Sequence, residues 1–133
     1  IVGGVPTLIL TTQLIIDVTP WYDPRYLIPL AGMIFSNSMN SVSIAAERYA
    51  AEMHNGQKEE SARRTAFQAA LIPLVNSLMA VGLVSLPGMM TGQVLAGVSP
   101  LIAARYQIMV MCVLFGAAGL SAVCYLSWAR KVR

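Results

Sequence analysis

Residues 65–104 read TAFQAALIPLVNSLMAVGLVSLPGMMTGQVLAGVSPLIAA, forty positions without an Asp, Glu, Lys or Arg. A helix rises 1.5 Å per residue, so about 20 apolar residues cross the ~30 Å hydrocarbon core of a bilayer. The stretch is long enough for one crossing and a further element. Pro87 and Gly88 break it, and proline does not continue a helix. We expect a membrane-crossing helix that ends near Pro87.

The rest of the chain has the same character. Of its 133 residues 11% are charged and the mean hydropathy is +0.64, whereas soluble domains carry about 25% charged residues. Besides 65–104, the uncharged segments are 1–16, 26–46 and 106–129. They predict an all-α, polytopic membrane helix bundle with about four transmembrane helices. The alternative, a soluble helical core, is disfavoured because so short a chain has little interior.

The first segment is apolar from Ile1 onward and has no initiator methionine. We interpret residues 1–133 as a single transmembrane domain, a fragment whose N-terminal helices are absent.

The basic residues predict an orientation. They concentrate in the hydrophilic stretch 47–64 and at the C-terminus, in Arg130, Lys131 and Arg133. Lys and Arg mark cytoplasmic loops, so both regions are expected in the cytoplasm. Because these residues fall at segment ends without interleaved aromatics, they do not indicate nucleic-acid binding.

Polar side chains within the apolar segments are candidates for a substrate pathway. Asn37 and Asn40 lie on one helical face of 26–46, and Asn76 and Ser77 lie together in the third segment. These residues either line a substrate pathway or form hydrogen bonds between helices, because interhelical amide hydrogen bonds also hold membrane helices together. Pro29 and Pro73 fall inside these helices, where each removes a backbone hydrogen bond and is expected to act as a hinge.

Residues 87–99 form the element that interrupts the third segment. We expect a short apolar piece, re-entrant or along the outer rim, with Pro87 and Gly88 as its hinge. Met89, Met90 and Gln93 would face the pathway. A gate would use such a piece, but so would a plain packed loop.

Catalysis and metal binding find no support in the sequence. His54 has no cysteine or carboxylate at a ligand spacing. Cys112 and Cys124 lie about 18 Å apart along one predicted helix and cannot pair. The eight methionines fit apolar packing better than copper binding. We therefore predict a protein that is not an enzyme, with no cofactor or metal held by this chain.

Three stretches carry a resemblance: PRYLIPLAGMI (24–34), AVGLVSLPGMMTGQVLAGVSPL (80–101) and ARYQIMVM (104–111). Together they resemble the FetB family, bacterial iron-export ABC permeases related to plant aluminium-tolerance permeases. The resemblance covers the C-terminal half of such a permease. It implies a bacterial inner-membrane protein, a permease homodimer, and a separate cytoplasmic ATP-binding subunit that holds ATP and Mg²⁺.

In such a transporter, residues 47–64 would contact the ATPase. The expected coupling residues are seven of the eight charged residues of this segment: Glu47, Arg48, Glu52, Glu59, Glu60, Arg63 and Arg64. Glu59 with Arg63, and Glu60 with Arg64, have the i, i+4 spacing of helical ion pairs. The alternative is a solvated helical hairpin without a partner.

The resemblance implies ATP-driven alternating access that exports iron, another metal or a small solute. A non-transporting scaffold or channel-like oligomer is the alternative. The expected spans carry no mid-membrane carboxylate for a hard cation, so the sequence does not identify the transported substrate.

Overall fold

The computed structural model describes residues 4–10, 24–81 and 88–131, which form five helices. These are α1 (Gly4–Leu10), α2 (Pro24–His54), α3 (Glu59–Ala80), α4 (Gly88–Leu95) and α5 (Pro100–Lys131). The predicted all-α class is confirmed for this part of the chain.

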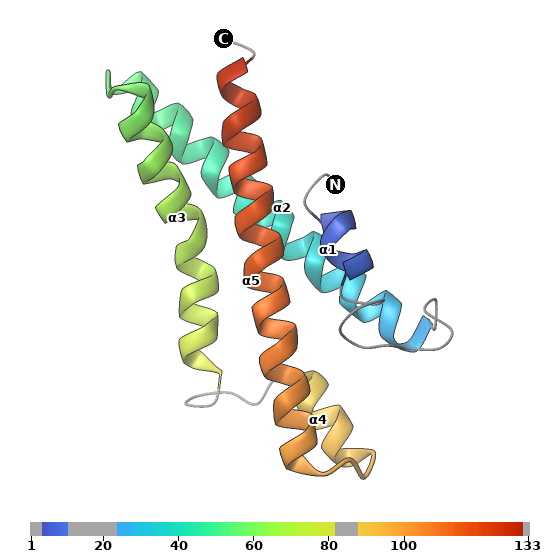
Figure 1. The fold of residues 1–133 in the computed structure, drawn as a ribbon. Coiled ribbons are helices and arrows are strands. Elements are labelled where there is room, and N and C mark those ends of the chain that lie inside the picture. Colours follow the sequence, from blue (N-terminus) through green and yellow to red (C-terminus); the bar gives the residue numbers. More distant parts are fainter. Residues whose placement is uncertain (1–3, 11–23, 82–87, 132–133) are drawn as a thin grey trace.

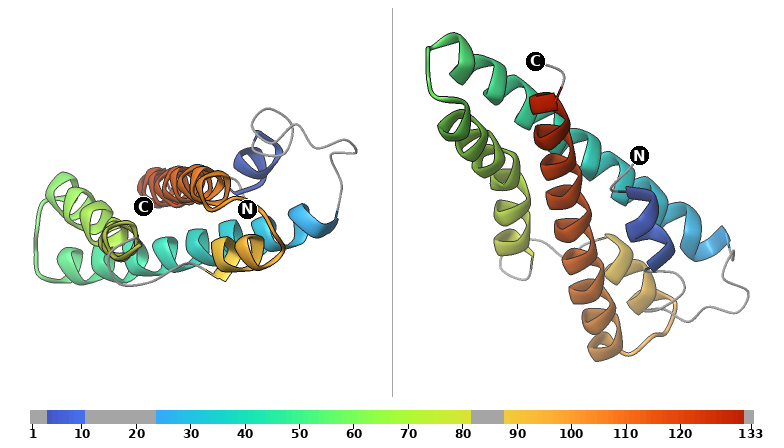
Figure 2. Two further views of the ribbon diagram at one scale, coloured as in Figure 1. Left: turned by 90° about the horizontal axis from the view of Figure 1, so that it is seen from below. Right: turned by 45° about the horizontal axis from the view of Figure 1, so that its top comes forward.

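The long helix α2 supports the other elements. It forms an antiparallel hairpin with α3, joined by a turn in which Gly56 has a φ of 75°, a conformation that favours glycine. Helix α5 crosses α2, with α3 on one side and α1 on the other (Figures 1 and 2). Helix α4 packs against the first part of α5 (Figure 1).

Prolines set the starts of the two longest helices. Helix α2 begins at Pro24 and α5 at Pro100, as expected for a residue that needs no partner for its missing N–H. The carbonyl of Ser99 accepts the first bond of α5 from the N–H of Ala103, at 3.0 Å. Pro29 and Pro73 lie inside α2 and α3, and their role as hinges stays a prediction.

Only one described helix is long and apolar enough to cross a bilayer by itself. This helix is α5, over Pro100–Ala129. Helix α2 carries two asparagines and four serines in its middle, and α3 starts with four charged residues among its first six. The uncharged part of α3, from Thr65 to Ala80, is therefore shorter than a ~20-residue crossing. The expected count of four spans is not confirmed.

The third apolar segment leaves its helix earlier than expected. Helix α3 ends at Ala80, and Val81 is extended, with φ −66° and ψ 121°. The prediction of a helix that continues to Pro87 was wrong. Helix α3 already starts at Glu59, so its 22 residues end at Ala80. In the sequence Val81 is followed by Gly82, and glycine is a poor helix former. Pro87 itself lies outside the described residues, while Gly88 begins α4.

The core has two parts with different side-chain sizes. Near the α2–α3 turn, α2, α3 and α5 meet through small residues, with Tyr49 and Leu126 at the edge. Further along, larger aliphatic side chains such as Leu30, Ile34 and Leu114 pack α2 against α5. Beyond Leu74, α3 is mostly exposed. Helix α3 thus lies close to α2 and α5 at one end and separates from them toward the other.

A buried hydrogen bond joins α2 to α3 where the two parts meet. Ser41 is 2% exposed, and its Oγ donates to the carbonyl oxygen of Ala70 at 3.0 Å. Replacing Ser41 by alanine should lower the free energy of unfolding by about 1 kcal/mol, the usual value for an interhelical hydrogen bond in a membrane protein. Thermal unfolding in detergent would measure the loss. The matched variant Ser36→Ala, at an exposed position of α2, should change it little, and equal losses would contradict the assignment.

Candidate functional site

The separation of the helices leaves a cavity of about 380 Å³ between α2, α3 and α5. It lies beside the last two turns of α3 and the first half of α5, with Gly88 of α4 at its border. Its lining is mostly apolar: Met33, Asn37, Leu74, Ser77, Leu78, Ala80, Val81, Gly88, Gln107, Val110, Met111 and Leu114. A cavity of this size that is apolar with a few polar groups is typical of a small-ligand site.

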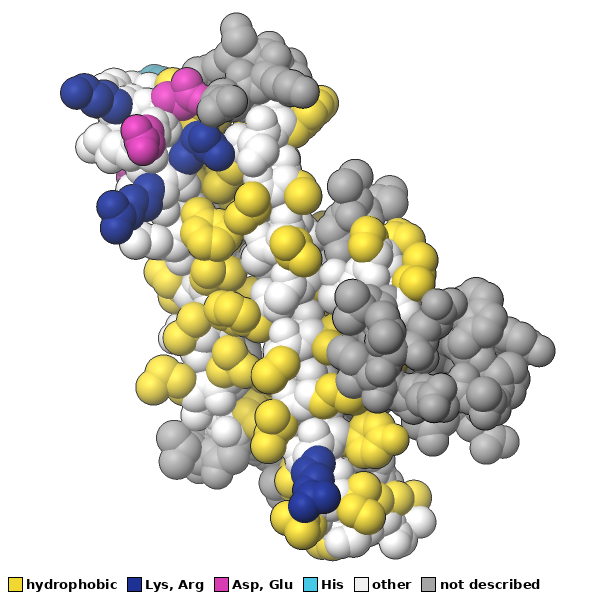
Figure 3. Space-filling view, in the orientation of Figure 1, with side chains coloured by type: hydrophobic (Ala, Val, Ile, Leu, Met, Phe, Trp, Pro, Cys, Tyr) yellow, Lys and Arg dark blue, Asp and Glu magenta, His cyan; other side chains and the backbone are white. Residues whose placement is uncertain are grey.

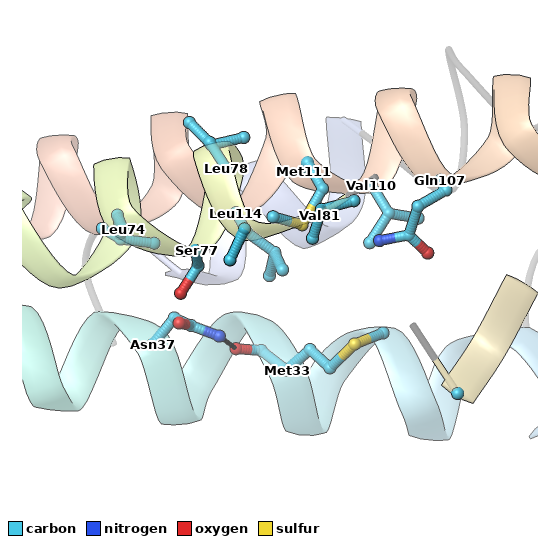
Figure 4. A pocket seen from close by; sticks show the side chains of 12 residues that line it. Met33, Asn37, Leu74, Ser77, Leu78, Val81, Gln107, Val110, Met111 and Leu114 are labelled. Atoms are coloured by element: carbon cyan, nitrogen blue, oxygen red, sulfur yellow. Dashed lines mark hydrogen bonds between the residues drawn. The ribbon is translucent and has the colours of Figure 1, made fainter. Parts of the chain in front are cut away.

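Two polar side chains face each other across this cavity, Asn37 from α2 and Ser77 from α3 (Figure 4). Asn37 donates its Nδ2 to the carbonyl of Met33 at 2.8 Å, and the Ser77 hydroxyl donates to the carbonyl of Pro73 at 2.9 Å. Both donors are thus held by their own helices. The Ser77 proton is used in its bond to Pro73, but Asn37 keeps a second N–H, so the two side chains offer a bound molecule their oxygen atoms and one amide donor.

The third polar group is Gln107 of α5, which the sequence reasoning missed. Its side chain lines the cavity at 8% exposure and forms no hydrogen bond to any described residue. Its amide atoms are not among the fully buried unpartnered atoms of the described residues, so the amide is accessible from the cavity. Such a group is satisfied when water or a ligand occupies the cavity, so Gln107 is the strongest candidate for a ligand contact. The signal for it was a lone amide near the start of an uncharged run.

The other predicted pathway residues lie elsewhere. Asn40 and Asn76 are exposed, and neither lines the cavity. Gln93 and Met90 are half-buried on α4, which also contains Met89. The structure therefore brings together Asn37 and Ser77 of the predicted set. A pathway role for the other residues stays a prediction.

The chemistry of the cavity is that of amides, a hydroxyl and two thioethers, from Met33 and Met111. Across the described residues, no group of three or more His, Cys, Asp or Glu side chains is placed to hold a metal ion. The cavity can accept a neutral or weakly charged molecule through hydrogen bonds and apolar contact. It has no carboxylate to balance a bare divalent cation, which prefers charged oxygen ligands.

The charged segment 47–64 lies far from this cavity, at the end of the bundle where α2 turns into α3. Lys, Arg and Glu side chains gather there (Figure 3). Most of the predicted coupling residues are exposed, and Glu52 and Arg63 are partly buried. Arg48 pairs with Glu52 at 2.7 Å.

The two ion pairs expected within α3 are not formed. In the described ranges, neither Glu59 with Arg63 nor Glu60 with Arg64 comes within 4.0 Å. Exposed pairs of this kind contribute at most about 1 kcal/mol, so helix formation by α3 does not need them.

Comparison with known proteins gives one family. The model of the uncharacterised protein family UPF0014 matches residues 1–63 and 56–132. A membrane protein of Synechocystis, slr1647, is 51% identical over 112 residues, which cover 73% of this chain and 43% of the relative. The probable iron export permease protein FetB of Escherichia coli is 40% identical over 80% of the chain and 48% of FetB.

A plant relative shows the same pattern. The Arabidopsis thaliana protein ALUMINUM SENSITIVE 3 is 34% identical over 80% of the chain and 45% of its own length. The chain thus spans about half the length of the curated relatives it matches. No solved structure matches it.

Proposed function

Because this chain belongs to the UPF0014 family of integral membrane proteins, we propose that it is part of the permease subunit of an ABC-type transporter. The observation that carries the proposal is the cavity between α2, α3 and α5, with the unpartnered amide of Gln107 in its wall. Similarity to FetB, a probable iron export permease, supports export as the direction and iron as the first cargo to test.

The residues that line the cavity limit the chemical form, bare ion or chelate, in which iron would pass through it. Asn37, Ser77 and Gln107 supply neutral oxygen and nitrogen atoms, whereas Fe(III) and Fe(II) without ligands favour charged oxygen or imidazole groups. The cargo that fits the described cavity is therefore a chelated metal or another small polar solute. A bare ion would need ligands from outside the described residues.

The proposed mechanism is alternating access. ATP and Mg²⁺ bind to a separate cytoplasmic subunit, whose closure moves segment 47–64. Helices α2 and α3 then tilt at Pro29 and Pro73, and the cavity changes the side to which it opens. The positive-inside rule supports a cytoplasmic position for 47–64 and the C-terminus. A permease homodimer with two ATPases would complete the transporter.

Flux measurements test this function. The intact permease, reconstituted in vesicles with its ATP-binding subunit, should move chelated iron at least tenfold faster with Mg-ATP than with a non-hydrolysable analogue. ATP hydrolysis drives the return step, so the analogue should not support repeated cycles. Vesicles with the ATPase alone are the control. Equal flux without nucleotide would favour a channel-like oligomer, and no flux of any cargo would favour a scaffold.

A charge swap at the exposed turn tests the coupling segment separately. Lys58→Glu combined with Glu59→Lys keeps the net charge and changes only exposed side chains. We expect transport-linked ATP hydrolysis to fall about tenfold, because complementary charges orient such contacts, while membrane insertion stays the same. Unchanged hydrolysis would remove these residues from the contact.

A further inference from the structure

A second hollow, separate from the transport cavity, lies at the charged end of the bundle. It has a volume of about 230 Å³ between the start of α3 and the end of α5. We call it the Arg63 groove, lined by Glu60, Arg63, Arg64, Phe67, Val123 and Leu126. Its α3 wall is mainly charged and its α5 wall is aliphatic.

Arg63 is the unsatisfied group in this groove. The side chain is partly buried, and its Nε is fully buried without a hydrogen-bond partner among the described residues. Guanidinium stays protonated at all physiological pH values. Leaving a charged donor buried and unpaired costs more than leaving a neutral one. The two Nη groups of Arg63 are not among the buried unpartnered atoms, so they are the donors that a negatively charged acceptor in the groove can reach.

Within the described ranges, no carboxylate accepts a hydrogen bond from Arg63. Glu60 lines the same groove but comes within 4.0 Å of neither Arg63 nor Arg64. Two arginines against one glutamate leave the groove with a net positive charge. An acceptor for the Nη groups of Arg63 therefore comes from solvent or from a molecule outside this part of the chain.

The aliphatic wall restricts what that acceptor is attached to. Val123 is 45% exposed, and Leu120, one turn earlier on α5, is 56% exposed. They continue the groove as an apolar track along the helix that is suited to cross a membrane. A free anion would use the arginines and leave this track uncovered. A phosphate that carries an acyl chain would use both.

We propose that the Arg63 groove binds the phosphate of an anionic phospholipid, with an acyl chain along Val123 and Leu120. Arginine suits this ligand because its planar fork donates two parallel hydrogen bonds to phosphate oxygens. Basic pockets between membrane helices are known to take such headgroups. The inference does not rest on the proposed transport function, since it requires only that α5 lies in the bilayer.

Lipid titration of the purified full chain in neutral detergent tests the proposal. Native mass spectrometry would count bound phosphatidylglycerol, with phosphatidylcholine and inorganic phosphate as separate arms. We expect retention of phosphatidylglycerol over phosphatidylcholine, and at least a tenfold loss of its affinity in Arg63→Gln, because a charge-assisted hydrogen bond is lost. The matched control is Arg48→Gln, an exposed arginine outside the groove, which should change affinity less than twofold.

Four results would overturn the proposal. Equal affinity in Arg63→Gln and the unchanged protein would remove the site, as would equal losses in Arg63→Gln and Arg48→Gln. Displacement of the lipid by millimolar inorganic phosphate would assign the groove to a free anion. Loss of ATPase stimulation in Arg63→Gln with lipid binding intact would assign Arg63 to protein docking.

A second variant keeps the proposal testable where Arg63→Gln does not fold. Glu60→Gln removes the negative charge from the groove with almost no change in size. Phosphatidylglycerol should bind this variant a few-fold more tightly, while phosphatidylcholine binding stays the same. Unchanged or weaker phosphatidylglycerol binding in Glu60→Gln would contradict the electrostatic basis of the site.

Discussion

Replacing Ala66 by leucine should destabilise the bundle by about 3 kcal/mol, the largest stability effect that we expect of a single substitution in the described residues. Ala66 is fully buried in the cluster where α2, α3 and α5 meet. Three added carbon atoms have no space between helices at close contact, and overpacking of this kind typically costs about 1–3 kcal/mol. Helix α3 would have to move away from its neighbours.

The pattern around Ala66 explains why the effect should be large. Ala62, Ala66 and Ala70 recur at every fourth position and are all buried. In lipid the hydrophobic effect does not drive helices together, so close approach through small residues provides most of the attraction. A displaced α3 would lose this contact along its length, together with the hydrogen bond from Ser41 to Ala70.

The measurement is thermal unfolding in detergent, followed by size-exclusion chromatography of the heated samples. Ala50→Leu makes the same chemical change at an exposed position of α2 and should stay within about 0.5 kcal/mol of the unchanged protein. Similar losses in both variants would show that the cost belongs to leucine itself, not to the contact between the helices.

The elements of this fold were largely predictable, because they depend on local signals. Pro24 and Pro100 stand at the starts of α2 and α5, where proline is favoured, and the long uncharged runs predicted helices. The mixed-charge stretch 47–64 was expected to be compatible with a helical hairpin, and it contains the turn between α2 and α3. These signals act within a few residues, so no tertiary information is needed to read them.

The cavity was predictable only in part. Asn37 and Ser77 stood out as polar residues in apolar segments, and both line it. Gln107 did not stand out, because α5 is apolar on every side and its sequence does not mark the face that packs inward. Asn40 shares much of its sequence context with Asn37 but is exposed. The rotation of each helix about its axis depends on packing, which periodicity does not determine here.

The largest functional effect should come from Gln107→Leu. Leucine has nearly the volume of glutamine, so the shape of the cavity is kept while its unpartnered amide is lost. A binding site built around polar groups loses affinity for its polar ligand when one of them is removed. We expect ATP-dependent flux in reconstituted vesicles to fall about tenfold or more, and Gln68→Leu, at an exposed position of α3, to leave flux within twofold of the unchanged protein.

Stability should move in the opposite direction, and this separates a functional role from a structural one. The Gln107 side chain is largely removed from solvent and has no described partner, and replacing it by an apolar group should stabilise the protein by about 1 kcal/mol. Thermal unfolding without cargo would then show a higher midpoint for Gln107→Leu, alongside its lower flux. A residue that only holds helices together would lose stability and flux at the same time. That result would remove Gln107 from the ligand contact and leave the cavity as a packing defect.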